Sequence, residues 1–202
     1  MTPLSTAWSQ LLPGCEQVGA ELLARWSEPH RHYHDLSHLT HSLAALRELG
    51  GTARAERLAL WFHDAIYTGR PGNDEHDSAR LASDLLTGAG LPTAEVQEVH
   101  RLVLVTIDHA PDPTDGAGAR VSDADLAILG AEPARYLASV ASLRAESGTV
   151  HDRLWRTSRL ARVAELLAAD PLFHTAAGRS RWLAAARANL VAEQRSLLAG
   201  RG

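Results

Sequence analysis

The chain has 202 residues, 45% of them hydrophobic, which suits one ordinary domain with a sizeable core. Its formal net charge of −4 provides no positive field for phosphate groups, which argues against nucleic acid polymers and anionic membranes as partners. No window approaches the roughly 20 apolar residues that span a bilayer. The chain also lacks the apolar run of a secretory signal and has a single cysteine, Cys15. We therefore expect a cytoplasmic protein with a single domain over 1–202.

Apolar residues recur every three or four positions along almost the whole chain, and strand-like alternation is nowhere sustained. This periodicity predicts an all-α fold, with helices over 6–26, 36–49, 52–67, 75–87, 93–109, 124–129, 133–146, 151–169 and 179–198. We expect a core over about 26–130, followed by C-terminal helices over about 133–198. The acidic stretch 110–120, rich in Pro and Gly, is expected to be a mobile surface loop.

Five histidines lie between positions 30 and 41. On a helix, His34, His38 and His41 would lie at i, i+4 and i+7, so their imidazoles would project from roughly one face. Such a stripe is costly in a core and useful in a site. His34 and His38 are therefore candidates for a functional site. The remaining histidines, taken singly, are better explained as half-exposed surface residues: His30, His32 and His41.

A second candidate is the pair His63-Asp64, which ends the apolar run Leu60-Trp61-Phe62. A carboxylate buried beside an imidazole in apolar surroundings needs either a hydrogen-bonded partner or a metal ion. A cation would satisfy both side chains at once. The dipeptide by itself is weak evidence, since such pairs also occur by accident.

A third candidate is the pair of carboxylates that opens the predicted helix 124–129. Asp123 stands where a capping residue would serve the helix end, whereas Asp125 lies inside the turn and has no capping role. We therefore assign Asp125 to an ion and Asp123 to capping or to orienting the ligands, with the reverse assignment left open. The three candidates together supply a mixed nitrogen and oxygen ligand set for one divalent cation.

These stretches resemble the HD superfamily of metal-dependent phosphohydrolases, and in particular its small bacterial branch of predicted HD phosphohydrolases. The likeness extends over about 26–193 and includes Arg-x-Tyr-His-x-x-x-His, Trp-Phe-His-Asp-Ala-Ile-Tyr, Asp-Glu-x-x-Ser-Ala, Asp-x-Asp-Leu-x-Ile-Leu-Gly and Ala-Arg-Ala-Asn-Leu. It implies a compact HD-domain helical bundle with additional C-terminal helices. The chain departs from the branch at Asp74, where Asn is usual, and at Ser147, where Arg-x-Glu is usually followed by Tyr.

The resemblance also implies roles for the two candidate histidines. Cyclic-nucleotide phosphodiesterases share a Tyr-His-Asn-x-x-His arrangement in which the second His binds metal and the first donates a proton. Here these positions are His38 and His34, with Asp35 in place of the Asn. The implied cofactor is one divalent ion, Mn, Fe, Co, Ni, Zn or Mg, because the additional histidines of dinuclear members are not apparent. The implied ligands are His38, His63, Asp64 and Asp125.

A metal-dependent hydrolase of a small phosphate ester, such as a nucleotide, is the function that this resemblance implies. The ion would lower the pKa of its bound water from 15.7 towards about 7 and make that water the nucleophile, while His34 protonates the leaving oxygen. The alternative is a metal-binding module that senses a ligand or serves as a scaffold, without turnover.

Three further residues have two interpretations each. Glu75 would orient the attacking water, or it is a charge in the first turn of a helix. His109 would contact the substrate, or it stabilises a helix C-terminus. Arg31 would bind a phosphate through its planar donors, or it is a solvated surface residue.

Overall fold

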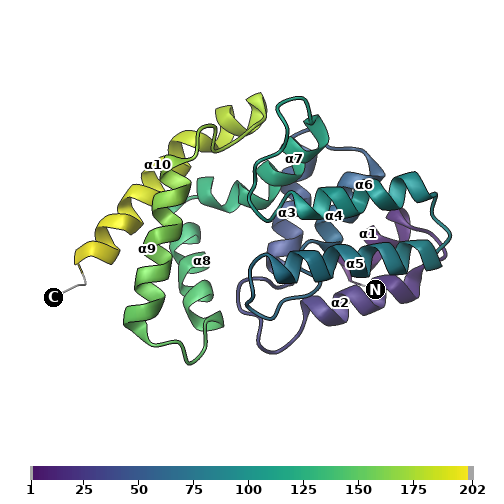
Figure 1. Cartoon of the computed structure of the whole chain (residues 1–202), viewed down its shortest axis with the longest axis horizontal. Coiled ribbons are helices and arrows are strands. Elements are labelled where there is room, and N and C mark those ends of the chain that lie inside the picture. The colour runs from purple at the N-terminus through teal and green to yellow at the C-terminus, as the bar shows by residue number, and fades with distance from the viewer. Residues whose placement is uncertain (1, 200–202) are drawn as a thin grey trace.

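The computed structural model describes residues 2–199, and every regular element within them is a helix (Figure 1). The elements are α1 (Pro3–Leu11), α2 (Glu16–Trp26), α3 (Leu36–Glu48), α4 (Arg54–Phe62), α5 (Asn73–Gly88), α6 (Thr93–Leu104), α7 (Gly116–Asp125), the 3-10 helix η1 (Leu126–Gly130), α8 (Pro133–Glu146), α9 (Asp152–Ala168) and α10 (Ala176–Ala199). The predicted all-α fold is confirmed. Within 2–199, no helix is both long and apolar enough to cross a membrane.

Helix α4 is the central element of the N-terminal bundle. It contacts α1, α3, α5, α6 and α7, and its residues 58–62 are all buried. A helix that is covered on all sides must be apolar on all sides, which explains the uninterrupted sequence Leu-Ala-Leu-Trp-Phe. The buried end of α4 therefore carries the next residues, His63 and Asp64, into the interior.

The C-terminal helices α8, α9 and α10 lie beside this bundle and pack around a second apolar cluster (Figure 1). Tyr136, Val163, Phe173 and Leu190 are buried in that cluster, while Trp182 packs against both clusters. The junction runs along η1, which contacts α3, α7, α8 and α10. The C-terminal helices are thus held against the N-terminal bundle close to α3.

The single helix predicted over 6–26 is wrong in its middle. Pro13 has no backbone N–H and Gly14 adopts a φ of +80°, a conformation that glycine enters without a steric penalty. The chain therefore turns between α1 and α2. The turn is fixed by Trp8, whose Nε1 donates a hydrogen bond of 2.8 Å to the carbonyl oxygen of Cys15.

The loop predicted over 110–120 is also partly wrong, because α7 begins at Gly116. Asp115 caps this helix by accepting a hydrogen bond of 2.9 Å from the backbone N–H of Gly118, and it forms an ion pair with Arg101 of α6. The acidic character of this stretch reflects helix capping in part. As a consequence, Asp123 and Asp125 lie in the last turn of α7 rather than at a helix start.

The contact between η1 and α10 predicts the effect of a single added methyl group. A Cβ atom at Gly130 would lie 2.5 Å from Cβ of Trp182 and 2.8 Å from its backbone, so α10 would have to shift. We expect Gly130→Ala to lower the free energy of unfolding by about 1–3 kcal/mol, the usual cost of overpacking. Urea unfolding of the two proteins measures this difference.

The matched control is Gly88→Ala at the end of α5, where an added Cβ meets nothing within 4 Å. We expect this variant to be as stable as the original protein or more stable, by up to about 1 kcal/mol. Equal stability of the two alanine variants would contradict the close approach of η1 and α10.

Candidate metal centre

Two imidazoles are brought together by the start of α3 and the end of α4. Asp35 caps α3 by accepting hydrogen bonds from the backbone N–H groups of Ser37, at 2.8 Å, and His38, at 3.2 Å. His63 is the residue that follows α4, and its Nδ1 lies 2.8 Å from the carbonyl oxygen of Leu60. Because a carbonyl oxygen only accepts hydrogen bonds, Nδ1 of His63 carries the proton. Its Nε2 is left free as a donor atom for a cation.

Two carboxylates lie beside these imidazoles. Nε2 of His38 is 3.1 Å from Nε2 of His63, 3.0 Å from Oδ1 of Asp125 and 3.4 Å from Oδ2 of Asp64. Nε2 of His63 is 2.9 Å from Oδ2 of Asp64 and 3.4 Å from Oδ1 of Asp125. The ligand atoms of His38, His63 and Asp125 all lie within 4.8 Å of one another.

These separations fit the coordination sphere of one metal ion. An octahedral ion with bonds of about 2.1 Å holds neighbouring ligand atoms about 3.0 Å apart, and a tetrahedral ion holds them about 3.4 Å apart. Imidazole nitrogens and carboxylate oxygens are common ligands of divalent first-row metals. The buried group of His38, His63 and Asp125 could therefore hold a metal ion.

The electrostatics of the cluster favour a positive charge at its centre. Burial lowers the pKa of His38, but hydrogen bonds of its imidazole to Asp125 and Asp64 outweigh burial and raise the pKa to about 8. Burial likewise lowers the pKa of His63, and the charges of the two carboxylates raise it well above its usual value. Burial alone would raise the pKa of both carboxyl groups, yet the histidines hold both well below their usual range. Protons on the imidazoles balance the carboxylates in the way that a bound cation would.

Arg31 was predicted to contact a substrate, but its side chain lies in the interior of the protein. Its side chain is fully buried and donates hydrogen bonds to the carbonyl oxygens of His34, at 3.0 Å, Asp64, at 2.7 Å, and Ala65, at 3.2 Å. It does not line the cleft described below. The prediction that Arg31 binds substrate is thus unsupported. Its guanidinium instead ties the segment before α3 to the turn after α4, which positions the ligands on both.

His34 precedes α3, so the predicted helical stripe with His38 and His41 is wrong, but its ring still points to the centre. It shares the wall of the cleft with His38 and Asp64, and it stacks on Tyr67 at 4.3 Å between ring centroids. Nδ1 of His34 lies 2.6 Å from Oε2 of Glu146 at the end of α8. A carboxylate at this distance fixes the proton on Nδ1 and directs Nε2 elsewhere.

Glu146 is the functional residue that sequence reasoning missed. Its side chain is 1% exposed, and Oε1 accepts hydrogen bonds of 3.0, 3.1 and 3.0 Å from the backbone N–H groups of His32, Tyr33 and His34. Burial would raise the pKa of Glu146, but the bonds and charge of His34 lower it to about 2. The departure from Arg-x-Glu-Tyr at Ser147 drew attention to this stretch. Nothing in the pattern indicated a partner more than 100 residues away.

A cleft of about 500 Å³ opens on this centre between the N-terminal bundle and the C-terminal helices. Glu75 lines it, while Oε2 of Glu75 also accepts a hydrogen bond of 2.6 Å from the backbone N–H of Gly72 at the start of α5. The far wall is formed by α8 and α9. That wall carries the cleft's guanidinium groups, Arg159 and Arg162.

His109 lines the same cleft from the segment between α6 and α7. Among residues 2–199, His109 is the only residue other than glycine that has a positive φ, which is 55°. Its Nε2 lies 3.7 Å from Oδ2 of Asp125, and burial lowers its pKa to about 4. A neutral imidazole held in a sparsely populated backbone conformation beside the centre is typical of a functional position.

Asp123 does not cap a helix start, contrary to the capping interpretation. It is fully buried and accepts hydrogen bonds from the backbone N–H groups of His174, at 2.7 Å, and Thr175, at 2.8 Å, and from the Thr175 hydroxyl, at 2.7 Å. These bonds engage both carboxylate oxygens, and they tie α7 to the segment that leads into α10. Of the two aspartates, Asp125 is the one whose oxygens face the imidazoles.

Comparison with known proteins identified no relative of this chain. No protein-family model, curated protein or solved structure matches this chain. The functional argument therefore depends on the geometry of the centre.

Replacing Glu146 should lower stability by an amount that depends on pH in a defined window. The pKa of this carboxyl falls from about 4.5 to about 2 on folding, so its charge stabilises the fold above pH 5 and the gain disappears as the pH falls towards 2. We expect Glu146→Gln to lower the free energy of unfolding at pH 7 by roughly 2 kcal/mol, with a smaller difference at pH 3. Urea unfolding of both proteins at several pH values measures it.

The control for this experiment is Glu132→Gln, an exposed position at the other end of α8. Its effect on the free energy of unfolding should be small, within about 0.5 kcal/mol, as is usual for a surface substitution. A deficit of Glu146→Gln that stays constant between pH 7 and pH 3 would contradict the charged interaction with His34.

Proposed function

We propose that the protein is a metal-dependent phosphohydrolase whose single divalent ion is held by His38, His63, Asp64 and Asp125. The observation that carries the proposal is the spacing of the four donor groups: the carboxylate oxygens of Asp64 and Asp125 lie 2.9 to 3.4 Å from the Nε2 atoms of the two histidines. Asp64 completes the set because its Oδ2 lies beside both imidazoles. The motifs that resemble the HD superfamily contain these four residues, which supports the same class of reaction.

A divalent ion bound there would supply Lewis acidity towards a phosphate oxygen and would lower the pKa of a bound water towards about 7. The groups of the chain supply what remains. Arg31 holds the two ligand-bearing segments together, and Trp26 covers the imidazoles, with its ring centroid 5.4 Å from that of His63. This apolar cover keeps bulk water from the inner side of the centre.

His34 is the group that exchanges a proton with the leaving oxygen. Glu146 accepts a hydrogen bond from Nδ1, so Nε2 is the nitrogen that delivers the proton. The carboxylate also fixes the orientation of the ring, so that Nε2 is directed away from Glu146. Hydrolysis leaves that proton on the alcohol product, and the attacking water supplies its replacement.

The cleft fits a small phosphate ester. Its volume of about 500 Å³ lies within the range of small-molecule sites, roughly 300–1,000 Å³. Arg159 and Arg162 lie on the wall formed by α9, where Arg159 is paired with the buried Glu193 and Arg162 lies 3.4 Å from Glu165, which also lines the cleft. Their charges are therefore largely balanced. The bound metal ion would supply the attraction for an anionic group, and Leu129 and Leu166 offer apolar contacts to an organic portion. Nucleotides contain both an anionic group and an organic portion.

The test is a screen of nucleotides, cyclic nucleotides and simple phosphomonoesters with Mn, Co, Mg, Ni and Zn supplied in turn. We expect hydrolysis of at least one ester that requires added metal and stops with chelator. Stoichiometric metal binding without turnover of any ester would contradict hydrolysis and favour the metal-binding sensor or scaffold.

Removal of the proton donor should separate chemistry from metal binding. We expect His34→Ala to lower kcat by about 10²-fold or more, the usual effect of losing a general acid, with one metal ion per chain retained. Steady-state kinetics and elemental analysis measure the two quantities. The matched control is His76→Ala, an exposed position on α5, which should leave both unchanged. Loss of the metal in His34→Ala would make His34 a ligand.

Asp64→Asn should remove most of the stabilisation that metal provides. Saturation of the original protein at about 100 times the dissociation constant should raise the free energy of unfolding by about 2.7 kcal/mol, because the ion binds the folded state. The variant keeps the shape of the side chain but loses its charge, so its thermal midpoint should barely respond to added Mn. Asp84→Asn, at an exposed position of α5, should respond as the original protein does. An unchanged response in Asp64→Asn would remove Asp64 from the ligand set.

A further inference from the structure

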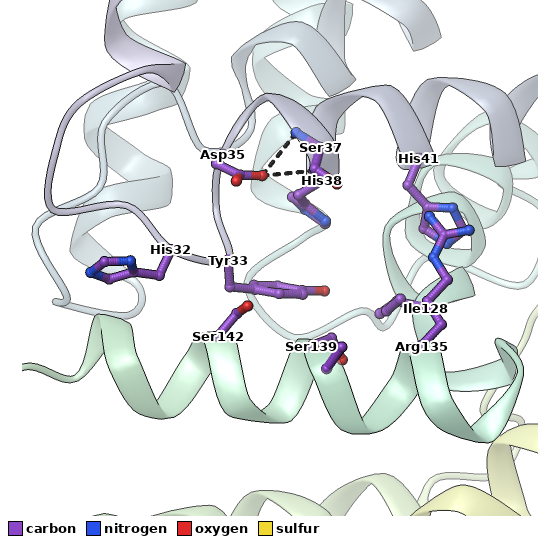
Figure 2. A pocket seen from close by; sticks show the side chains of 11 residues that line it. His32, Tyr33, Asp35, Ser37, His38, His41, Ile128, Arg135, Ser139 and Ser142 are labelled. Atoms are coloured by element: carbon purple, nitrogen blue, oxygen red, sulfur yellow. Dashed lines mark hydrogen bonds between the residues drawn. The ribbon is translucent and has the colours of Figure 1, made fainter.

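A second cavity, of about 200 Å³, adjoins the metal centre on the other side of His38 (Figure 2). It lies between the start of α3, η1 and α8, and it shares Tyr33, His38, Ile128 and Ser139 with the cleft. A water occupies about 30 Å³ in the liquid, so the cavity has room for a small anion and a few waters. The function proposed above makes no use of this space.

One end of the cavity carries two polar side chains that lack partners. Nε2 of His41 is buried and makes no hydrogen bond, and Arg135 makes no hydrogen bond or ion pair within the part of the chain that the structure describes. Figure 2 shows the two side chains together at this end. Burial, and next the charge of Arg135, lower the pKa of His41 to about 4, so the two groups are close and the positive charge belongs to Arg135. A buried polar atom such as Nε2 of His41 normally has a partner, and a ligand bound here would supply one and would also pair with the exposed guanidinium of Arg135.

The rest of the lining provides hydroxyl groups. Ser139 and Ser142 face the cavity from α8 on the side opposite His38 (Figure 2). The Ser139 hydroxyl donates a hydrogen bond of 2.7 Å to the carbonyl oxygen of Tyr136, so Ser142 is the one of the two that is left to donate to a ligand. The cavity has one carboxylate, that of Asp35, whose Oδ1 is engaged by the backbone N–H groups at the start of α3. A guanidinium group, imidazoles and hydroxyls around a small space are the donors that a tetrahedral oxyanion requires.

We propose that this cavity is a phosphate-binding subsite, with Arg135 as its charged donor and His41 and Ser142 as neutral donors. The phosphate comes either from a substrate with two phosphate groups or from free inorganic phosphate. Only this choice of source rests on the proposed phosphohydrolase function. Binding of the anion by itself does not.

The first test uses the metal-free protein, so that phosphate cannot bind through a metal ion. Calorimetric titration with inorganic phosphate should give one site per chain, and Arg135→Gln should weaken the affinity by 10-fold or more. His41→Asn should also weaken it, and Arg195→Gln, an exposed position of α10, should not. Absence of saturable binding, or equal affinity in Arg135→Gln, would overturn the proposal. Arg135 is exposed, so its replacement leaves the fold intact.

The second test distinguishes the sources in the metal-loaded protein. If a second phosphate of the substrate occupies the subsite, Arg135→Gln should raise KM about 10-fold for esters with two phosphates and leave KM for monophosphates unchanged. If free phosphate occupies it, the same variant should weaken only inhibition by added phosphate. Failure of all hydrolysis would contradict the proposed function, while the titration of metal-free protein would still decide the subsite.

Discussion

Two carboxylates and two imidazoles share one buried position, and the balance of their charges constrains the structure around them. The Nε2 atoms of His38 and His63 are 3.1 Å apart, a distance that two positively charged imidazoles would not favour without negative charge beside them. Asp64 and Asp125 raise the pKa of both rings. A cation in this position satisfies all four side chains at once.

The surrounding structure holds these groups at the ends of helices, where side chains can converge on one point. The apolar α4 delivers His63 and Asp64 into the interior, and Asp35 starts α3 so that His38 lies in its first turn. The C-terminal helices complete the site from the other side. Glu146 binds the backbone and ring of His34, and Glu193, which bonds Tyr136 and Arg159, keeps α8, α9 and α10 together behind the cleft. The site therefore depends on both apolar clusters.

Local patterns in the sequence predicted the helices and the clusters of His and Asp residues, because both depend on neighbours along the chain. The resemblance to the HD superfamily then implied which four of these residues would bind a metal. Long-range contacts could not be read in this way. Arg31 resembles a surface arginine until its carbonyl partners are known, and Asp123 resembles a helix cap until the segment at His174 packs against it. Glu146 had no local signal of its link to His34. The turn at Pro13 was overlooked, although Pro followed by Gly is a strong local signal.

The most direct test of the metal centre is a crystal structure of the protein soaked with Mn, with data collected for anomalous scattering. The account predicts one strong peak per chain, at bonding distance, about 2.0–2.3 Å, from Nε2 of His38 and His63 and from the carboxylates of Asp64 and Asp125. Absence of a peak between these four side chains, at saturating Mn, would contradict it.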